Sequence, residues 1–139
     1  MDEDDNHITC KVVLVGESGV GKTCINKRFI EGIYTGNETP NSSASFSSKT
    51  IEFPEYRDES IKFEIWDTVG QEKYRSMGKI FYKGAHAAIL VYEITNKQSF
   101  IEIKQYWHQQ IKEYASKEAN KSLFYLLYFY YFNYSFSWK

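Results

Sequence analysis

The sequence predicts one α/β domain built around a mostly parallel sheet, and three observations support this. Two continuous apolar runs, residues 11–15 and 85–92, are typical of strands buried on both faces, as in the interior of a parallel sheet. Each run is followed by a segment with helical spacing of its apolar residues. Between them, two strand-like segments are separated by a polar connection, which adds one antiparallel step.

A glycine-rich turn joins the first strand to the first helix. The strand covers residues 11–15 and the helix residues 22–30, where Ile25 and Phe29 lie one turn apart on the side that faces the sheet. Residues 32–45 follow and are rich in Gly, Asn, Pro and Ser, which predicts a long loop.

The next two strands are expected to form a hairpin. They cover residues 44–53 and 61–66, and the polar residues 54–60 connect them. The second strand alternates apolar and charged side chains, which indicates one polar face.

The second half of the chain continues the α/β order. A short helix is expected to end near Lys83, the interior strand 85–92 follows, and a longer helix covers residues 99–114. Its apolar positions repeat at intervals of three and four residues and are Phe100, Ile103, Trp107, Ile111 and Tyr114.

Composition argues against several classes of function. The 139 residues carry a net charge of -1, so no basic field indicates nucleic acid or an anionic membrane as a partner. Cys10 and Cys24 have no metal-type spacing with the three histidines and are interpreted as small apolar side chains in a reducing, cytoplasmic compartment. The sequence shows no secretory signal and no cysteine near Lys139, so we expect neither secretion nor a prenyl anchor.

Residues 16–23 read Gly-Glu-Ser-Gly-Val-Gly-Lys-Thr and satisfy the pattern G-x-x-x-x-G-K-[ST]. Glycines allow backbone N–H groups to point inward at phosphate oxygens, and the helix that starts near Lys22 directs its positive dipole end at the same anion. Lys22 supplies a full charge for the β- and γ-phosphates, and the Thr23 hydroxyl is placed to bind Mg²⁺. A chance match is the alternative, but the position of the turn between a buried strand and a helix favours a phosphate site.

A second constellation follows the strand 61–66. Asp67 stands at the strand end, where a carboxylate can hold Mg²⁺ or its bound water, although helix N-capping is a common alternative role there. Gly70 permits close approach of a backbone N–H to a γ-phosphate. Gln71 has a neutral donor and acceptor, which suits the orientation of an attacking water.

These segments resemble the Ras-like GTPases, and their Rab branch most closely. Residues 66–72 read W-D-T-V-G-Q-E, similar to the family's W-D-T-A-G-Q-E, and residues 81–86 read F-Y-K-G-A-H, similar to the Y-Y-R-G-A segment of Rabs. Residues 91–96 followed by Ser-Phe at 99–100 look like the family's V-Y-D-x-T…S-F. The resemblance runs from about residue 10 to residue 114, with features that lean toward early-endosomal Rabs.

The resemblance implies the three-layer α/β fold of P-loop nucleoside triphosphatases, in a C-terminally incomplete small GTPase domain. It implies a switch that binds GTP and GDP, hydrolyses GTP slowly, and meets exchange factors, activating proteins and effectors in vesicle traffic at endomembranes. Arginine fingers of activating proteins typically add roughly 10³–10⁵ in rate, so intrinsic hydrolysis is expected to be weak. Residues 32–46 and 67–79 would be the two switch loops, ordered by γ-phosphate and Mg²⁺.

The resemblance also implies a set of site residues. Gln71 would be the catalytic residue that places the water, and Mg²⁺ the cofactor held by Thr23 and Asp67. The phosphate contacts would come from Glu17, Ser18, Gly19, Val20, Gly21, Lys22, Thr23, Cys24 and Gly70.

One departure from the family lies in the first switch loop. Rabs carry a threonine there that binds Mg²⁺, but the ungapped count from the phosphate loop gives Asn41-Ser42-Ser43. The Asn41 carbonyl oxygen could bind the ion, Thr39 could replace it if the loop slips by two residues, and Ser42 if it slips by one. The remaining alternative is that this loop makes no metal contact.

The second departure concerns guanine recognition. The family reads the base through N-K-x-D and a later S-A-K, and neither motif occurs in this sequence: Asn120-Lys121-Ser122 lies near the expected region, but no aspartate follows it. We therefore divide the chain into a disordered acidic start at 1–8, a partial GTPase domain at 9–121 and an aromatic-rich segment at 122–139.

The aromatic-rich segment has three interpretations. Its apolar stretch is about half the ~20 residues of a membrane span, which disfavours that interpretation. A strand beside residues 85–92 is the second. We favour the third, in which the open reading frame departs from the original coding sequence near Lys121, for example through an unspliced intron in a very A/T-rich genome.

Two rival functions remain at this point. The chain could be a non-catalytic fragment that keeps the switch surface but binds nucleotide weakly or not at all. A P-loop kinase is disfavoured, because residues 66–72 suit a water nucleophile rather than an acceptor substrate.

Overall fold

The computed structural model describes residues 7–36, 43–56, 59–68, 75, 78–117 and 124–130, and of residues 7, 78, 115–117 and 124–130 it describes the backbone alone. The elements, in chain order, are β1 (His7–Val15), α1 (Lys22–Glu31), β2 (Ser45–Phe53), the 3-10 turn η1 (Pro54–Tyr56), β3 (Glu59–Asp67), α2 (Gly78–Tyr82), β4 (Ala87–Glu93), α3 (Lys97–Glu102), the π-helical turn η3 (Ile103–Trp107), α4 (His108–Lys117) and β5 (Phe124–Tyr130).

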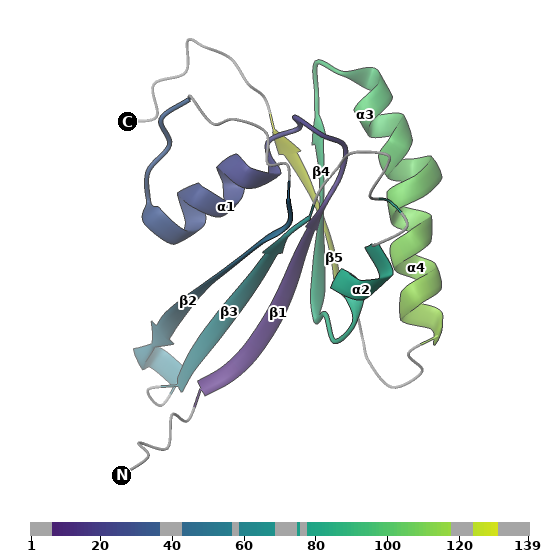
Figure 1. The fold of residues 1–139 in the computed structure, drawn as a ribbon. Coiled ribbons are helices and arrows are strands. Elements are labelled where there is room, and N and C mark those ends of the chain that lie inside the picture. Colours follow the sequence, from purple (N-terminus) through teal and green to yellow (C-terminus); the bar gives the residue numbers. More distant parts are fainter. Residues whose placement is uncertain are drawn as a thin grey trace.

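The sheet has the order β2-β3-β1-β4-β5 (Figure 1). Its pairings are parallel between β1 and β3, between β1 and β4, and between β4 and β5, while β2 and β3 are antiparallel. The predicted α/β class and its single antiparallel step at the hairpin are therefore confirmed. Because β1 lies between β3 and β4, the loops that follow all three strands meet at one edge of the sheet.

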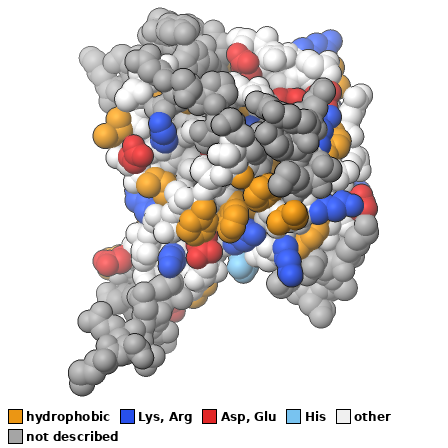
Figure 2. Space-filling view, in the orientation of Figure 1, with side chains coloured by type: hydrophobic (Ala, Val, Ile, Leu, Met, Phe, Trp, Pro, Cys, Tyr) orange, Lys and Arg blue, Asp and Glu red, His pale blue; other side chains and the backbone are white. Residues whose placement is uncertain are grey.

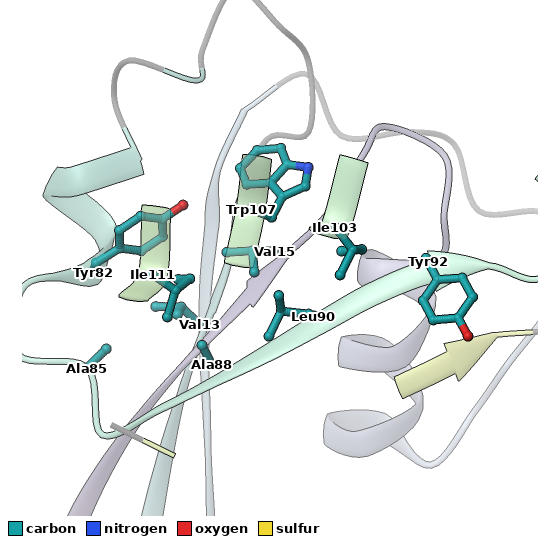
Figure 3. Close-up of a cluster of buried hydrophobic side chains, with 10 residues drawn as sticks. All are labelled: Val13, Val15, Tyr82, Ala85, Ala88, Leu90, Tyr92, Ile103, Trp107 and Ile111. Carbon is teal, nitrogen blue, oxygen red and sulfur yellow. The ribbon is translucent and has the colours of Figure 1, made fainter. Parts of the chain in front are cut away.

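Helices cover both faces of the sheet and give three layers. Helix α1 lies on one face, and α2, α3 and α4 lie on the other (Figure 1). A cluster of buried apolar side chains lies on each face of the sheet, and alternate residues of β1 contribute to the two clusters. Val12 and Leu14 pack on the α1 side with Phe29, whereas Val13 and Val15 face the other helices. Figure 3 shows the larger cluster, which consists of Val13, Val15, Tyr82, Ala85, Ala88, Leu90, Tyr92, Ile103, Trp107 and Ile111.

The first strand begins earlier than the sequence predicted. His7 and Ile8 pair in parallel with Ser60 and Ile61, so they belong to β1 and not to the expected disordered start at 1–8. The long partner strand β3 provides the hydrogen-bonding groups that extend the pairing beyond the apolar run at 11–15. The acidic residues 1–6 lie outside the described residues.

The helix expected at 99–114 begins at Lys97 and contains a π-helical turn between α3 and α4. Its start is capped by Asn96, whose side chain accepts a hydrogen bond from the Ser99 backbone N–H at 3.3 Å. A π-turn shifts the helix face that follows it, and such turns are frequent at functional sites. Ile103, Trp107 and Ile111 are buried as the apolar spacing predicted.

The aromatic-rich segment contributes a strand. The backbone of β5 pairs in parallel with β4, from Ala87 opposite Phe124 to Glu93 opposite Tyr130. This pairing agrees with the second interpretation of the segment, a strand beside residues 85–92. None of the helices in the described ranges combines the length and the apolar character that a membrane crossing requires. The departure of the reading frame near Lys121 stays a prediction.

Candidate functional site

The glycine-rich turn after β1 adopts backbone conformations that favour glycine. Gly16 has φ +147°, and a Cβ placed on it would lie 2.2 Å from the Val91 carbonyl oxygen of β4. Gly21, at the start of α1, has φ +104°. A side chain at position 16 would push the turn away from the sheet, so the glycine fixes how closely this loop approaches the strand ends.

Helix α1 starts without a side-chain cap from any described residue. Gly21 occupies the cap position, and its carbonyl accepts the first helical hydrogen bond from Ile25 N–H at 3.0 Å. The first-turn N–H groups of a helix have no intrahelical acceptor, and here they stand at its positive dipole end. The start of α1 is therefore suited to an anion.

Lys22 folds back over the loop. Its ammonium group donates to the carbonyl oxygens of Gly16, at 2.9 Å, and Glu17, at 2.7 Å, and the residue is 6% exposed. Burial lowers the pKa of Lys22 to about 8, against the charges of Asp67 and Glu17, which act to raise it. An ammonium has three donors, so two carbonyl bonds leave capacity for one further acceptor such as a phosphate oxygen.

Thr23 and Asp67 meet at the centre of the site. The Thr23 hydroxyl, in the first turn of α1, donates to Asp67 Oδ2 at 2.7 Å, at the end of β3. Asp67 is 1% exposed. The next residue is anchored as well, because Thr68 Oγ1 donates to the Leu14 carbonyl oxygen of β1 at 2.6 Å. The strand end that carries Asp67 is thus held against β1.

The donor set fits a magnesium ion shared with a bound nucleotide. Among the described residues, no group of three His, Cys, Asp or Glu side chains could hold a metal by itself. Mg²⁺ is commonly bound by one or two protein oxygens together with substrate phosphates and waters, rather than by an all-protein cage. The hydroxyl of Thr23 and the carboxylate of Asp67 are oxygen ligands of that kind.

The structure describes some of the other predicted site residues and leaves the rest outside its described ranges. Ser18 and Gly19 are exposed at the tip of the loop, Val20 is buried beneath it, and Cys24 is half-buried in α1. The remaining predictions, Gly70, Gln71, Asn41, Thr39 and Ser42, lie outside the described residues. The structure therefore brings together the loop, Lys22, Thr23 and Asp67.

Comparison with known protein families decides the assignment. Residues 11–126 match the family model described as Ras family. The chain belongs to the Ras family. The match covers most of the chain and includes the second half of β1, the phosphate loop, the hairpin, α2 to α4 and the start of β5.

Membership of the Ras family indicates the general function of this site. The chain carries a Ras-family GTPase domain, which supports a GTP-binding switch, and nucleotide binding and contacts with regulators or effectors follow from the family. Ras-family GTPases typically bind their nucleotide with Mg²⁺, in agreement with the oxygen donors of Thr23 and Asp67.

The sequence did not predict one cluster next to the phosphate loop of this Ras-family domain. The carboxylate of Glu17 accepts hydrogen bonds from Arg75 Nη2 at 2.6 Å and from Trp107 Nε1 at 2.8 Å. Arg75 also donates to Glu102 at 3.0 Å. The partners of Glu17 are 58 and 90 residues away in sequence, so no local spacing could have identified them.

Proposed function

We propose that this chain is a Rab-type GTPase, which alternates between GTP- and GDP-bound forms, hydrolyses GTP to GDP and phosphate, and acts in vesicle traffic. The observation that carries the proposal is the contact between Thr23 and Asp67 beside the buried ammonium of Lys22. These groups lie beside the glycine-rich loop, in the arrangement that binding of a triphosphate and a shared metal ion needs.

In this proposal each residue has a separate task. Lys22 and the N–H groups of the loop and of the α1 start bind the phosphates and stabilise charge that develops on them during transfer. Thr23 and Asp67 would hold Mg²⁺, which when bound neutralises phosphate charge. Gln71 orients the water that attacks the γ-phosphate, and GDP is the leaving group.

A row of aromatic side chains supports a docking surface for effectors. Phe46 of β2 lies 5.2 Å from Trp66 of β3, and Trp66 lies 6.2 Å from Phe81 of α2, measured between ring centroids. Phe46 is 52% exposed. Figure 2 shows hydrophobic side chains gathered beside lysines and arginines across the middle of the face that it draws. Trp66 and Phe81 are partly buried, and aromatic clusters that combine partly buried and exposed rings are common at sites of protein interaction.

The Rab assignment and the location rest on sequence. Residues 81–86 and 66–72 carry the segments that resemble Rabs. We therefore propose a cytoplasmic protein that associates with endomembranes, in keeping with a family that acts in vesicle traffic.

A non-catalytic fragment is the second candidate function. It is favoured by the sequence after Asn120-Lys121, where no aspartate is present to read guanine. The aromatic row is built from β2, β3 and α2 and does not involve this region. A chain that binds effectors without nucleotide would use the same surface.

Titration with fluorescent GDP in Mg²⁺ separates the two candidates. A GTPase is expected to bind with a Kd in the micromolar range or tighter, and Lys22→Ala should abolish binding. Competition with unlabelled GTP and ATP tests the base, and single-turnover hydrolysis of GTP with Gln71→Leu tests the role of the glutamine. Circular dichroism of each variant verifies folding.

The binding and hydrolysis measurements distinguish the two candidate functions as follows. Binding that GTP but not ATP displaces, together with hydrolysis that Gln71→Leu slows, supports the GTPase. A folded chain that binds neither nucleotide supports the fragment, and a preference for ATP contradicts the proposed function.

A further inference from the structure

The carboxylate of Glu17 is held by two donors from segments that are distant in sequence. Arg75 Nη2 lies 2.6 Å from Glu17 Oε1, and Trp107 Nε1 lies 2.8 Å from the same oxygen. Trp107 is 2% exposed and belongs to the larger core cluster (Figure 3). The side chain of a phosphate-loop residue is therefore fixed by one core residue and by one residue of the second predicted switch loop.

Arg75 is itself well anchored. Its guanidinium bonds to Glu102 Oε2 of α3 at 3.0 Å and lies 4.3 Å from the ring centroid of Tyr106, whose hydroxyl donates to the Arg75 carbonyl oxygen at 3.3 Å. Burial lowers the pKa of Arg75, but the hydrogen bonds and charges of Glu17 and Glu102 outweigh this and raise it. The π-helical turn η3 provides both Tyr106 and Trp107, so it builds the platform for this arginine.

Glu17 is close enough to the phosphate site for its charge to matter there. Its own carbonyl oxygen accepts a hydrogen bond from the Lys22 ammonium at 2.7 Å, so its carboxylate belongs to the same residue that helps hold this ammonium in place. A carboxylate within electrostatic range of that ammonium also lies within range of an anion bound to it. Without a counter-charge, Glu17 would oppose the binding of a polyphosphate.

We propose that Arg75 is a positioning residue for the nucleotide: by pairing with Glu17 it cancels a negative charge that the phosphate loop would otherwise present to the phosphates. The inference rests on the proposed function, because it concerns the same phosphate site. Arg75 lies within the second predicted switch loop, residues 67–79. A partner that displaces the Arg75 side chain would remove the counter-charge and promote nucleotide release.

The expected effect is moderate. The side chains of Arg75 and Glu17 are 21% and 22% exposed, so solvent screens part of their interaction. We expect Arg75→Ala to increase the dissociation rate of fluorescent GDP by roughly threefold to tenfold. Because the effect is electrostatic, it should shrink as ionic strength rises above about 0.15 M.

Four variants of the full chain test the inference by the release rate of fluorescent GDP in Mg²⁺, with thermal unfolding as a check on folding. Arg75→Ala is expected to release GDP faster, and Arg75→Lys, which keeps the charge, to slow release again. The double variant Glu17→Gln/Arg75→Ala removes both charges, and its release rate should return most of the way to the wild-type rate. Glu102→Gln is the matched control: it removes the charge of the other partner of Arg75 but keeps an oxygen that accepts its hydrogen bond, so it should change the rate far less than Arg75→Ala does.

The rescue by Glu17→Gln distinguishes charge neutralisation from a packing role. If Arg75 mattered only through its contacts, the double variant would release GDP at least as fast as Arg75→Ala, and this result overturns the inference. Release from Arg75→Ala at the wild-type rate overturns it as well, while the proposed function stands. A folded wild-type chain that binds no GDP overturns both.

Discussion

The hydroxyl of Thr23 donates a hydrogen bond of 2.7 Å to the carboxylate of Asp67, across 44 residues of sequence. One residue stands in the first turn of α1 and the other at the end of β3, and β3 is the direct parallel neighbour of β1. The carboxyl ends of neighbouring parallel strands lie at the same edge of a sheet, so the topology alone brings both groups together. The two oxygens lie side by side in the folded chain, where Mg²⁺ with a nucleotide would bind.

The first prediction concerns the Asp67 carboxylate. Asp67→Asn keeps the size of the side chain and an acceptor for Thr23 but removes the charge that would hold Mg²⁺ or its bound water. We expect the affinity for GDP in Mg²⁺ to fall by about 10–100-fold. The measurement is GDP dissociation with Mg²⁺ and with EDTA, and the difference between the two conditions should largely disappear in the variant.

Glu64→Gln is the control for this experiment, because Glu64 lies on the same strand and the substitution removes the same charge. It should leave the effect of Mg²⁺ intact. If Asp67→Asn kept the full response to Mg²⁺, Asp67 would have the alternative role of a purely structural hydrogen-bond acceptor.

The second prediction concerns Gly16. Gly16→Ala places a Cβ at 2.2 Å from the Val91 carbonyl oxygen, at a φ of +147° that L-residues rarely adopt. We expect the free energy of unfolding to fall by roughly 2–4 kcal/mol, because both strain and displacement of the loop contribute. Urea denaturation measures the change.

Gly84→Ala is the matched variant, since Gly84 also has a positive φ, of +71°, but open space around the added atom. Its cost should be about 1 kcal/mol. Equal losses from the two variants would mean that the contact with Val91 relaxes without cost.

Local patterns were sufficient to place the centre of the site. The loop motif, the buried strand before it and the helix after it are consecutive in sequence, and Asp67 stands at a strand end that the alternation of residues 61–66 predicted. Given a parallel sheet, strand ends converge, so the meeting of Thr23 with Asp67 follows from topology. The roles of these residues toward phosphate and Mg²⁺ stay predictions.

Contacts between distant segments were not predictable in the same way. Opposite charges are common in this chain, and nothing local distinguishes Arg75 as the partner of Glu17. The π-helical turn at Ile103–Trp107 keeps the apolar spacing of an ordinary helix, so no local pattern distinguished it. The strand β5 was one of three interpretations, because apolar aromatic runs do not by themselves specify pairing.

The third prediction compares the indole N–H groups of two tryptophans, Trp107 and Trp66. Trp107→Phe removes the N–H that donates to Glu17 at 2.8 Å and leaves a charged acceptor with one donor fewer. In Trp66, by contrast, the buried Nε1 has no hydrogen-bond partner among the described residues. Trp107→Phe should therefore lower the free energy of unfolding by about 1–3 kcal/mol more than Trp66→Phe does. Urea denaturation of both variants checks this, and a larger loss from Trp66→Phe would contradict it.

The last prediction is a dependence of stability on pH that arises from Lys22. Burial lowers its pKa from 10.5 to about 8, so between these values the nucleotide-free folded chain has lost a proton that the unfolded chain still binds. Stability rises with pH wherever the unfolded state binds more protons, so the Lys22 contribution increases from about pH 8 upward. Lys22→Met removes this titration and serves as the reference. Since one pKa unit corresponds to about 1.4 kcal/mol, the wild type should gain about 2 kcal/mol relative to the variant between about pH 7 and pH 9.5. Denaturant unfolding at both values measures the gain, and a constant difference between the two proteins would show that Lys22 stays protonated in the folded chain throughout this range.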